Sequence, residues 1–559
     1  MFPRPETEIM TSSQSDTFST PQWARDAVWY QVMVERFRDG EAANNPDPMR
    51  PWTSEWYTPS PWEGTDGQTF YKYFVFQRHY GGDLQGLQQK LPYLKDLGVN
   101  ALYLNPVFQA NSHHKYDTTD YRHIDASFGA GGSDYEDTIK NEDLLDPSTW
   151  TFSKSDLIFL DFLKEAKRQG FKVIIDGVFN HVGTAHPAFR DVQERGHESP
   201  YADWFAITSW TPFDYEGWAG FKELPAFRKS PEDGIASRMA REHIFAITRR
   251  WMDPDGDGDP SDGVDGWRLD VPSEVPMPFW EAWRKLVKSI NPDAYITGEI
   301  WDRADAWLDG KTFDAVMNYQ FAQTAFAWIG NNQQRISPTE ADQRLLDLRN
   351  SYPPNVNHIL MNLADSHDTD RAVSKMFNPD RSYDDQNREQ NDETYNGSKP
   401  DERSYRKTRL LALLQVTYLG APMVYYGDEA GMWGSDDPNN RKPMLWKDLE
   451  PYDVPEDNHV MEDHLAFYAS ILNLRGSHSA LRDGSFKTIS THDQNNTWVF
   501  MREDDHEQIL VALNASDNDA AIDLPDLPEG WTPIHGTNEP PTSGITIPAL
   551  EGRVWARKT

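Results

Sequence analysis

A unit of helix, glycine and short apolar strand recurs along this chain and limits the folds open to it. In "GGDLQGLQQKLPYLKDLGVNALYLNPVF" the leucines from Leu84 to Leu97 fall on one helical face, and Gly98 stands where a helix C-cap belongs. The following "NALYLNP" is typical of a buried strand. Helices that alternate with such strands predict a parallel sheet covered by helices.

The unit returns in "SDLIFLDFLKEAKRQGFKVIID". Ser155 or Asp156 could cap this helix, a stripe from Leu157 to Leu163 would face the core, and Gly170 would end the helix before the strand. Other strands are expected in "DAVWYQVMVERF", "GVDGWRLD", "AYITGE", "FDAVMN", "HILMNL" and "APMVYY". Together these eight strands and the chain length favour a (β/α)8 TIM barrel over a doubly wound sheet.

The spacing of the strands predicts insertions and a further domain. The gap between the third and fourth strands is too long for a simple crossover, so an inserted lobe is expected there. Near the C-terminus, short strands with Gly, Asn and Asp turns replace the repeat and predict an antiparallel β domain. The expected parts are a flexible tail (1–22), the first part of the barrel (23–182) with an acidic insertion (128–156), the lobe and return to the barrel (183–262), the second part of the barrel (263–478) and a β-sandwich (479–559).

Composition narrows the choice of partners. The net charge of −35 disfavours nucleic acid and anionic membranes, and it suits a neutral substrate or a cation. Because the chain has no cysteine, disulfides and thiolate sites are excluded. The sequence has neither an apolar run of membrane-spanning length nor the apolar segment of a signal peptide, so we expect a cytoplasmic protein, either monomeric or homodimeric.

Polar residues stand at the carboxyl ends of four expected strands, where TIM barrels carry catalytic groups. The third strand ends in Asp176, the fourth in Asp270 and the fifth in Glu299, and the seventh runs into Asp368. Beside them in the sequence lie Arg268, His181 and His367. One aspartate at a strand end is often only a helix cap, but several carboxylates that meet at one barrel mouth indicate a catalytic site.

Two of these carboxylates are expected to differ in protonation. Arg268 and Asp270 are two residues apart in a strand, so they point to one face, and the guanidinium should keep Asp270 ionised. Glu299, placed among other negative charges, should have a raised pKa. An ionised carboxylate beside a protonated one is what glycoside hydrolysis requires.

Four segments taken together resemble the motifs of the α-amylase family, retaining enzymes that act on α-glucans on a (β/α)8 barrel. They are "DGVFNH" (176–181), "GWRLDVPSE" (266–274), "GEIW" (298–301) and "ADSHDTDR" (364–371). The flanking segments "WYQVMVERFRDG", "LNPVF", "HHKYDTTDY" and "YYGDEAGMWG" are similar to the family as well. The resemblance covers roughly residues 26–559.

The resemblance implies a role for each matching residue. Asp270 would be the nucleophile that forms a glycosyl ester, Glu299 the acid and later the base, and Asp368 the carboxylate that binds sugar hydroxyls. The residues that hold the nucleophile and the reacting sugar would be Arg268, His181, His367 and the stacking Tyr116, with Asp176 in a structural role.

Within the family the chain resembles the neopullulanase, cyclomaltodextrinase and maltogenic amylase group, by "HHKYDTTDY" and "GDEAGMWGSDDPNNRKPMLW". That match implies that Asp437 and Arg441 bind the non-reducing sugar. The group carries an N-terminal β domain, which we expect to be missing because the barrel starts near residue 26, and its fifth motif is replaced by "FKELPAF" (221–227). Hydrolysis of α-1,4 bonds in maltooligosaccharides or related α-glucans is implied, whereas cyclodextrin preference and dimerisation are not.

Two alternatives share this scaffold. A transferase would move the glucosyl group to another sugar through the same residues, and a non-catalytic relative would only bind carbohydrate. Such relatives lack one or more of the three carboxylates, all of which are present here, so catalysis is favoured. Because flat rings stack on sugars, we expect Trp210, Trp218 and Trp301 near the substrate.

Calcium is the expected cofactor, in a structural role, at two oxygen-rich segments. "RFRDGEAANNP" with "GGD" resembles a calcium site near the barrel's N-terminal end in related enzymes, with the candidate ligands Asp39, Glu41, Asn44, Asn45, Gly81 and Asp83. The loop "DPDGDGDPSDG" resembles the front of an EF-hand, with the candidate ligands Asp253, Asp255, Asp257 and Asp259. Val264 stands where an EF-hand needs Glu, and a solvated polar turn is the alternative at both segments. Asp262 and Asp265 are expected to shape the turn into the fourth strand.

Overall fold

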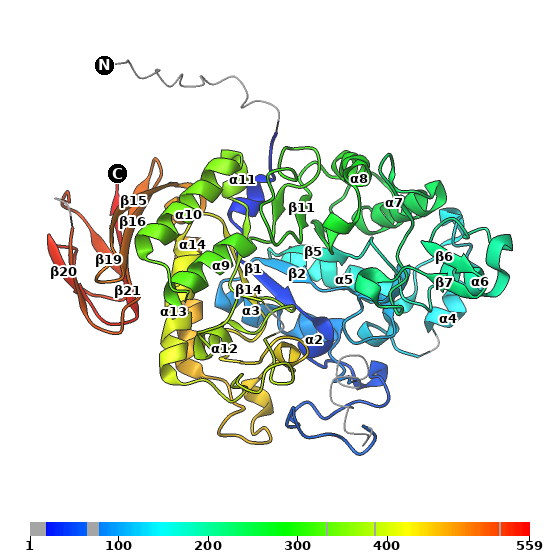
Figure 1. The fold of residues 1–559 in the computed structure, drawn as a ribbon, viewed down its shortest axis with the longest axis horizontal. Coiled ribbons are helices and arrows are strands. Elements are labelled where there is room, and N and C mark those ends of the chain that lie inside the picture. The colour runs from blue at the N-terminus through cyan, green and yellow to red at the C-terminus, as the bar shows by residue number, and fades with distance from the viewer. Residues whose placement is uncertain (1–17, 64–77, 133, 331–333, 385–386, 525–526) are drawn as a thin grey trace.

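The computed structural model describes residues 18–63, 78–132, 134–330, 334–384, 387–524 and 527–559 (Figure 1). Residues 1–17 of the expected tail lie outside the described residues. The described end of the tail is packed, because Phe18 contacts the main apolar core and the Arg284 guanidinium lies 5.4 Å from the centre of its ring.

Eight parallel strands form the centre of the molecule and confirm the predicted TIM barrel. They are β1 Trp29–Val32, β2 Ala101–Leu104, β5 Lys172–Gly177, β10 Gly266–Leu269, β11 Tyr295–Gly298, β12 Ala315–Val316, β13 Met361–Leu363 and β14 Ala421–Tyr425. Their order is β12–β11–β10–β5–β2–β1–β14–β13, and a bridge between Met317 and Met361 closes the ring. Trp29, Tyr103 and Tyr295 belong to a separate apolar cluster contributed by alternate strand residues, which fills the barrel.

Helices surround the barrel (Figure 1). The principal ones are α2 Leu84–Gln89, α3 Leu91–Leu97, α5 Lys154–Arg168, α7 Arg238–Met252, α8 Met277–Ile290, α9 Tyr319–Ile329, α10 Pro338–Ser351, α13 Glu402–Thr417 and α14 Glu462–Ser477. Within the described residues, none of the helices combines the length and apolarity needed to cross a membrane.

The first expected helix is in fact two helices. α2 ends at Gln89 and α3 begins at Leu91, with Pro92 in its first turn. Proline has no N–H to donate to the preceding turn, so a continuous helix would lose a hydrogen bond there. Gly98 ends α3 in the left-handed conformation, as predicted.

The second expected helix, α5, differs in its cap and in its buried face. Ser153 is the N-cap, rather than Ser155 or Asp156, and Asp156 completes a capping box with the backbone of Ser153. Leu157 is 51% exposed, so the predicted stripe is wrong at this end. Leu160 is half-buried, and the buried apolar face consists of Phe159, Phe162, Leu163 and Ala166, so only Leu163 of the predicted stripe is fully buried.

The lobe expected after the third strand is present, and the segment before α5 holds a hairpin that was not predicted, in addition to the acidic insertion expected at 128–156. Between β2 and α5 are the hairpin β3 Phe108–Ala110 and β4 Thr118–Ile124, and then α4 Asp134–Ile139. After β5 comes the lobe, on the right of Figure 1, with α6 Pro187–Arg195, β6 Ile207–Trp210, β7 Phe213–Tyr215, β8 Lys229–Ser230 and β9 Gly234–Ile235.

The C-terminal part is antiparallel, as predicted, and packs beside α10 and α13 (Figure 1). Its larger sheet has the order β15–β16–β17–β21–β19, and β18 pairs with β20. The strands are β15 Ser485–His492, β16 Thr497–Glu503, β17 Glu507–Asn514, β18 Ala520–Asp523, β19 Thr532–His535, β20 Gly544–Ile547 and β21 Glu551–Lys558. A separate apolar cluster that includes Val499, Leu510 and Trp555 lies between the two sheets.

Candidate active site

The polar residues at the strand ends meet at one mouth of the barrel. Asp176 lies in β5, Asp270 directly follows β10, Glu299 directly follows β11, and Asp368 lies in the loop after β13. Because all eight strands are parallel, these positions share the carboxyl end of the barrel. Asp270 and Glu299 are only 7% exposed.

Arg268 is the common partner of three carboxylates. Its Nη1 lies 2.9 Å from Asp176 Oδ2 and 3.1 Å from Asp270 Oδ1, and its Nη2 lies 2.8 Å from Glu299 Oε2. Asp176 and Arg268 are paired in register between β5 and β10, so both point into the barrel. The Arg268 side chain is completely buried, which makes each pair less screened by water.

This geometry corrects the predicted charge separation. Arg268 is shared with Glu299 and Asp176, so it does not serve Asp270 alone as the sequence suggested. Burial raises the pKa of Asp270 and of Glu299, and Arg268 opposes that rise for both. The raised pKa of Glu299 agrees with the prediction. For Asp270, burial and then the neighbouring carboxylates outweigh Arg268 and raise the pKa, so the guanidinium does not by itself keep this group ionised as predicted.

Asp368 is held differently. Its Oδ2 lies 3.0 Å from His367 Nε2, and its Oδ1 accepts a hydrogen bond from Arg441 Nη2 at 2.9 Å. Although burial opposes them, these two neighbours lower the pKa of Asp368. Asp368 is therefore the carboxylate of the three that is most firmly ionised.

Tyr116, His367 and His181 line the same mouth. Tyr116 Oη donates to Asp176 Oδ2 at 2.8 Å, and its ring stacks on the His367 ring with centroids 5.2 Å apart. His181 Nε2 lies 3.2 Å from the Tyr116 carbonyl oxygen. Burial lowers the pKa of His181 to about 3, so its imidazole is neutral at ordinary pH.

The two residues expected to bind the outer sugar lie together in the loop after β14. Arg441 Nη2 lies 3.9 Å from Asp437 Oδ2, and the same guanidinium meets Asp368. Two contacts were not predicted: Gln31 Nε2 lies 2.8 Å from His367 Nδ1, and Arg388 Nη2 lies 3.1 Å from Asp437 Oδ1. Gln31 could have been found as a polar residue within an otherwise apolar strand, whereas Arg388 lies in a long polar segment without a motif.

The three expected tryptophans separate into two kinds. Trp301 Nε1 donates to Glu299 Oε1 at 3.1 Å and its ring stacks on Tyr319, and Trp218 stacks on His181. Trp210, at the end of β6, has its ring contacts within the lobe, with His197 at 4.0 Å and Phe213. The structure thus brings Trp301 and Trp218 to the candidate site, but it shows no contact between Trp210 and the site.

The first candidate calcium segment folds around Asp83, the N-cap of α2. Asp83 accepts hydrogen bonds from the backbone N–H groups of Gly40, Glu41 and Gly86 and from Asn44 Nδ2. Since this segment follows β1, it lies beyond the carboxyl end of that strand rather than at the N-terminal end of the barrel.

Buried oxygens in this segment fit a hard cation. Asn45 Nδ2 donates to Asp39 Oδ2 at 3.0 Å, and the Asn45 side chain lies against Gly81 so closely that a β-carbon there would meet Asn45 Oδ1 at 2.5 Å. Among the described residues, Asn44 Oδ1 and Asn45 Oδ1 are buried without a hydrogen-bond partner. The Glu41 carboxylate accepts a hydrogen bond from the backbone N–H of Ala43. Amide and carboxylate oxygens of this kind are the ligands that calcium prefers.

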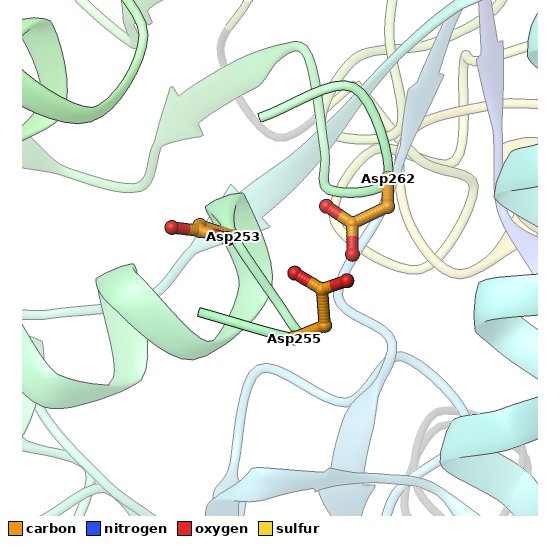
Figure 2. Close-up of side chains that lie close together, drawn as sticks. All are labelled: Asp253, Asp255 and Asp262. Carbon is orange, nitrogen blue, oxygen red and sulfur yellow. The ribbon is translucent and has the colours of Figure 1, made fainter. Parts of the chain in front are cut away.

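The acidic loop before β10 groups its carboxylates differently from the prediction. Oxygens of Asp253, Asp255 and Asp262 lie within 4.8 Å of one another (Figure 2). Asp257 and Asp259 are not in this group, although they accept hydrogen bonds from backbone N–H groups two residues ahead, as Asp255 also does. The loop joins α7 to the amino end of β10, opposite Asp270, as expected, whereas Asp262 was expected only to shape the turn.

Comparison with known proteins agrees with this arrangement. The family described as "Alpha amylase, catalytic domain" matches residues 31–141 and 155–484. The chain is 36% identical to neopullulanase 2 of Thermoactinomyces vulgaris over 506 residues, 90% of this chain and 71% of that protein. It is 34% identical to a Bacillus cyclomaltodextrinase over 500 residues, 89% of this chain and 74% of the relative.

Solved structures extend the likeness to the whole architecture. The ligand-free cyclic α-maltosyl-(1→6)-maltose hydrolase of Arthrobacter globiformis superposes with a TM-score of 0.73 at 26% identity, covering 97% of this chain and 100% of that one. A cyclomaltodextrinase superposes with a TM-score of 0.73 at 31% identity, covering 98% and 80%. The family match over most of the chain and the carboxylates around Arg268 agree: the chain belongs to the α-amylase family of glycosidases.

Proposed function

We propose that this enzyme hydrolyses α-1,4-glucosidic bonds of maltooligosaccharides or related α-glucans with retention of configuration. The observation that carries the proposal is the shared guanidinium, because Asp270 and Glu299 meet the two terminal nitrogens of Arg268. Two carboxylates held so closely favour the spacing of about 5–5.5 Å used by retaining enzymes over the spacing of about 6.5–9.5 Å used by inverting ones.

Each group then has a defined step. Asp270 attacks the anomeric carbon as its carboxylate, the form that Arg268 favours at 3.1 Å, and forms a glycosyl ester while Glu299, beside Trp301, gives its proton to the leaving oxygen. Glu299 next takes a proton from water, and the resulting hydroxide equivalent releases the sugar from Asp270. Arg268 balances the charge on the pair throughout, and the ionised Asp368 accepts hydrogen bonds from sugar hydroxyls.

The substrate class is supported by the names of the relatives, which include neopullulanase and cyclomaltodextrinases. A cytoplasmic setting is proposed because a relative at 31% identity is the intracellular maltogenic amylase of Bacillus subtilis.

The test uses maltotriose with the wild type, Asp270→Asn, Glu299→Gln and Asp368→Asn. The wild type should release glucose and maltose, with the new reducing end first seen as the α anomer by NMR. Each variant should lose activity by about 1,000-fold or more. Full activity of Asp270→Asn would contradict the mechanism, and products longer than maltotriose would show transfer to sugar in place of water.

We also propose that calcium stabilises the fold at the segment that contains Asn44 and Asn45, with a second site at Asp253, Asp255 and Asp262. The orphaned amide oxygens support the first site and the grouped carboxylates the second. Calorimetric titration of chelator-treated protein, compared with Asn45→Ala and Asp255→Ala, separates the two. Each variant should lose one binding event, and an absence of binding heat in the wild type would remove both sites.

A further inference from the structure

A row of alternating charges leads outward from Asp368. Arg441 Nη2 lies 2.9 Å from Asp368 Oδ1 and 3.9 Å from Asp437 Oδ2, and Arg388 Nη2 lies 3.1 Å from Asp437 Oδ1. The side chains of Asp368, Asp437 and Arg388 are 30%, 29% and 21% exposed, so they face solvent. Carboxylate acceptors that alternate with guanidinium donors can bind the vicinal hydroxyls of a sugar chain.

The outermost member, Arg388, comes from a segment with no family motif. It lies between α12 Ala372–Phe377 and α13, and it docks on the loop after β14 through both backbone and side chain. The backbone N–H of Asp436 donates to the Asn387 carbonyl oxygen at 3.0 Å, and Arg388 Nη2 lies 3.0 Å from Asp436 Oδ2. Arg388 is therefore held by two neighbouring carboxylates rather than one.

Glu389 connects this segment to two other segments of the chain. We call the residues Tyr57, Arg388, Glu389 and Asn439 together the rim. The Glu389 carboxylate accepts hydrogen bonds from Tyr57 Oη at 3.1 Å and Asn439 Nδ2 at 3.0 Å. It also accepts one from Ser435 Oγ at 2.6 Å. Three segments far apart in sequence are thus joined beyond Asp437.

The side of the cleft is assigned from the family resemblance together with the strand order. Glu299 and Trp301 follow β11, whereas Arg441 and Asp437 follow β14, which lies across the barrel between β13 and β1. Because the resemblance implies that Asp437 and Arg441 bind the non-reducing sugar, we assign the row and the rim to the glycone side of the cleft.

We propose that Arg388 and the rim close the glycone side of the cleft and make the enzyme cut short segments from the non-reducing end. This inference rests on the function proposed above and specifies its substrate choice. A chain with more glycone units would have to displace the Arg388–Asp437 pair and the hydrogen bonds of Glu389. Arg388 is thus a specificity-determining residue that lies outside the reacting carboxylates.

The test maps cleavage of maltoheptaose labelled at its reducing end, and compares kcat/KM for maltoheptaose with that for maltotriose. The wild type should release short unlabelled products from one end. Arg388→Ala should spread cleavage over internal bonds and raise the maltoheptaose to maltotriose ratio about tenfold. Arg388→Lys, which keeps the charge but cannot reach both carboxylates as a fork, should give a smaller shift in the same direction.

Arg403→Ala is the matched control, because Arg403 forms an exposed pair with Asp517, which lies between β17 and β18 of the C-terminal part. It should leave both the bond choice and the ratio unchanged. The inference would be overturned, without affecting the proposed function, if folded Arg388→Ala and Arg388→Lys cleaved the same bonds as the wild type. Random internal cleavage by the wild type would overturn it in the same way. A wild type that cleaves neither oligosaccharide would overturn the proposed function as well, so the two failures are distinguishable.

Discussion

Arg268 is the cation that three carboxylates of the candidate site share, because its guanidinium contacts Asp176, Asp270 and Glu299 at once. Lysine in its place keeps one positive charge but loses the planar fork. We expect Arg268→Lys to lower kcat by about 100-fold or more, since the charge that develops on the two carboxylates is no longer balanced at both. Steady-state kinetics on maltotriose measure this effect.

The control for that substitution is Arg284→Lys, which changes another buried arginine, paired with Asp314 outside the site. It should alter stability more than kcat. A near-normal kcat for folded Arg268→Lys would show that the shared guanidinium is not needed for the chemical step.

For single residues, the sequence identified those that belong to a motif, but it did not predict contacts that depend on the tertiary fold. Asp270 and Glu299 could be placed at strand ends, but their common arginine could not, because sequence spacing shows only the Arg268–Asp270 neighbour pair. The same limit applies to Arg388, whose partner Asp437 lies in another loop. The pKa of Asp270 was mispredicted because the extent of its burial is a tertiary property.

Among the elements, the joint between β4 and α5 has a pH-dependent stability. Burial alone would lower the pKa of His123, but hydrogen bonds with Asp156 and Glu142 raise it to about 9. Because the pKa of His123 is higher in the folded state than the unfolded value of about 6.5, the protonated side chain stabilises the fold. This stabilisation is fully present below about pH 6.5 and is lost as the pH rises through about 9. The full contribution is about 3 kcal/mol.

Urea unfolding of the wild type and of His123→Gln between pH 6 and pH 9.5 measures this contribution. The free energies of unfolding should differ most near pH 6 and converge as the pH rises. Parallel curves would contradict the linkage. A surface histidine variant, His506→Gln, serves as the control and should show a smaller difference from the wild type near pH 6.

The positions of the helices and strands were largely predictable from the sequence. The buried face of a helix and the point where a helix is interrupted were less predictable. Apolar strand runs and Gly98 act locally, so the strands and the end of α3 followed from the sequence. Pro92 also acts locally and could have indicated the break between α2 and α3. The exposure of Leu157 could not be predicted, because it depends on which neighbours cover that face of α5.

On the scale of the whole molecule, one buried arginine helps to attach the C-terminal sheets to the barrel. Among the described residues, its hydrogen bonds include no acidic partner. Arg502, in β16, is buried and donates to the carbonyl oxygens of Thr417 at 3.0 Å and Tyr418 at 2.8 Å, at the end of α13. It also donates to Gly484 at 3.0 Å. A cation at a helix C-terminus is favoured by the helix dipole, and its removal leaves buried carbonyl groups unpaired.

Arg502→Met should therefore destabilise the protein by about 3 kcal/mol or more, because methionine fills the space without donating a hydrogen bond. Arg403→Met is the matched variant, since Arg403 in α13 also reaches the C-terminal part but through an exposed pair with Asp517, and it should cost about 0–1 kcal/mol. Thermal melting and limited proteolysis between α14 and β15 measure both. If the two variants melt alike, attachment does not depend on the buried arginine, and the apolar contacts beside α10 and α13 must hold the C-terminal sheets in place.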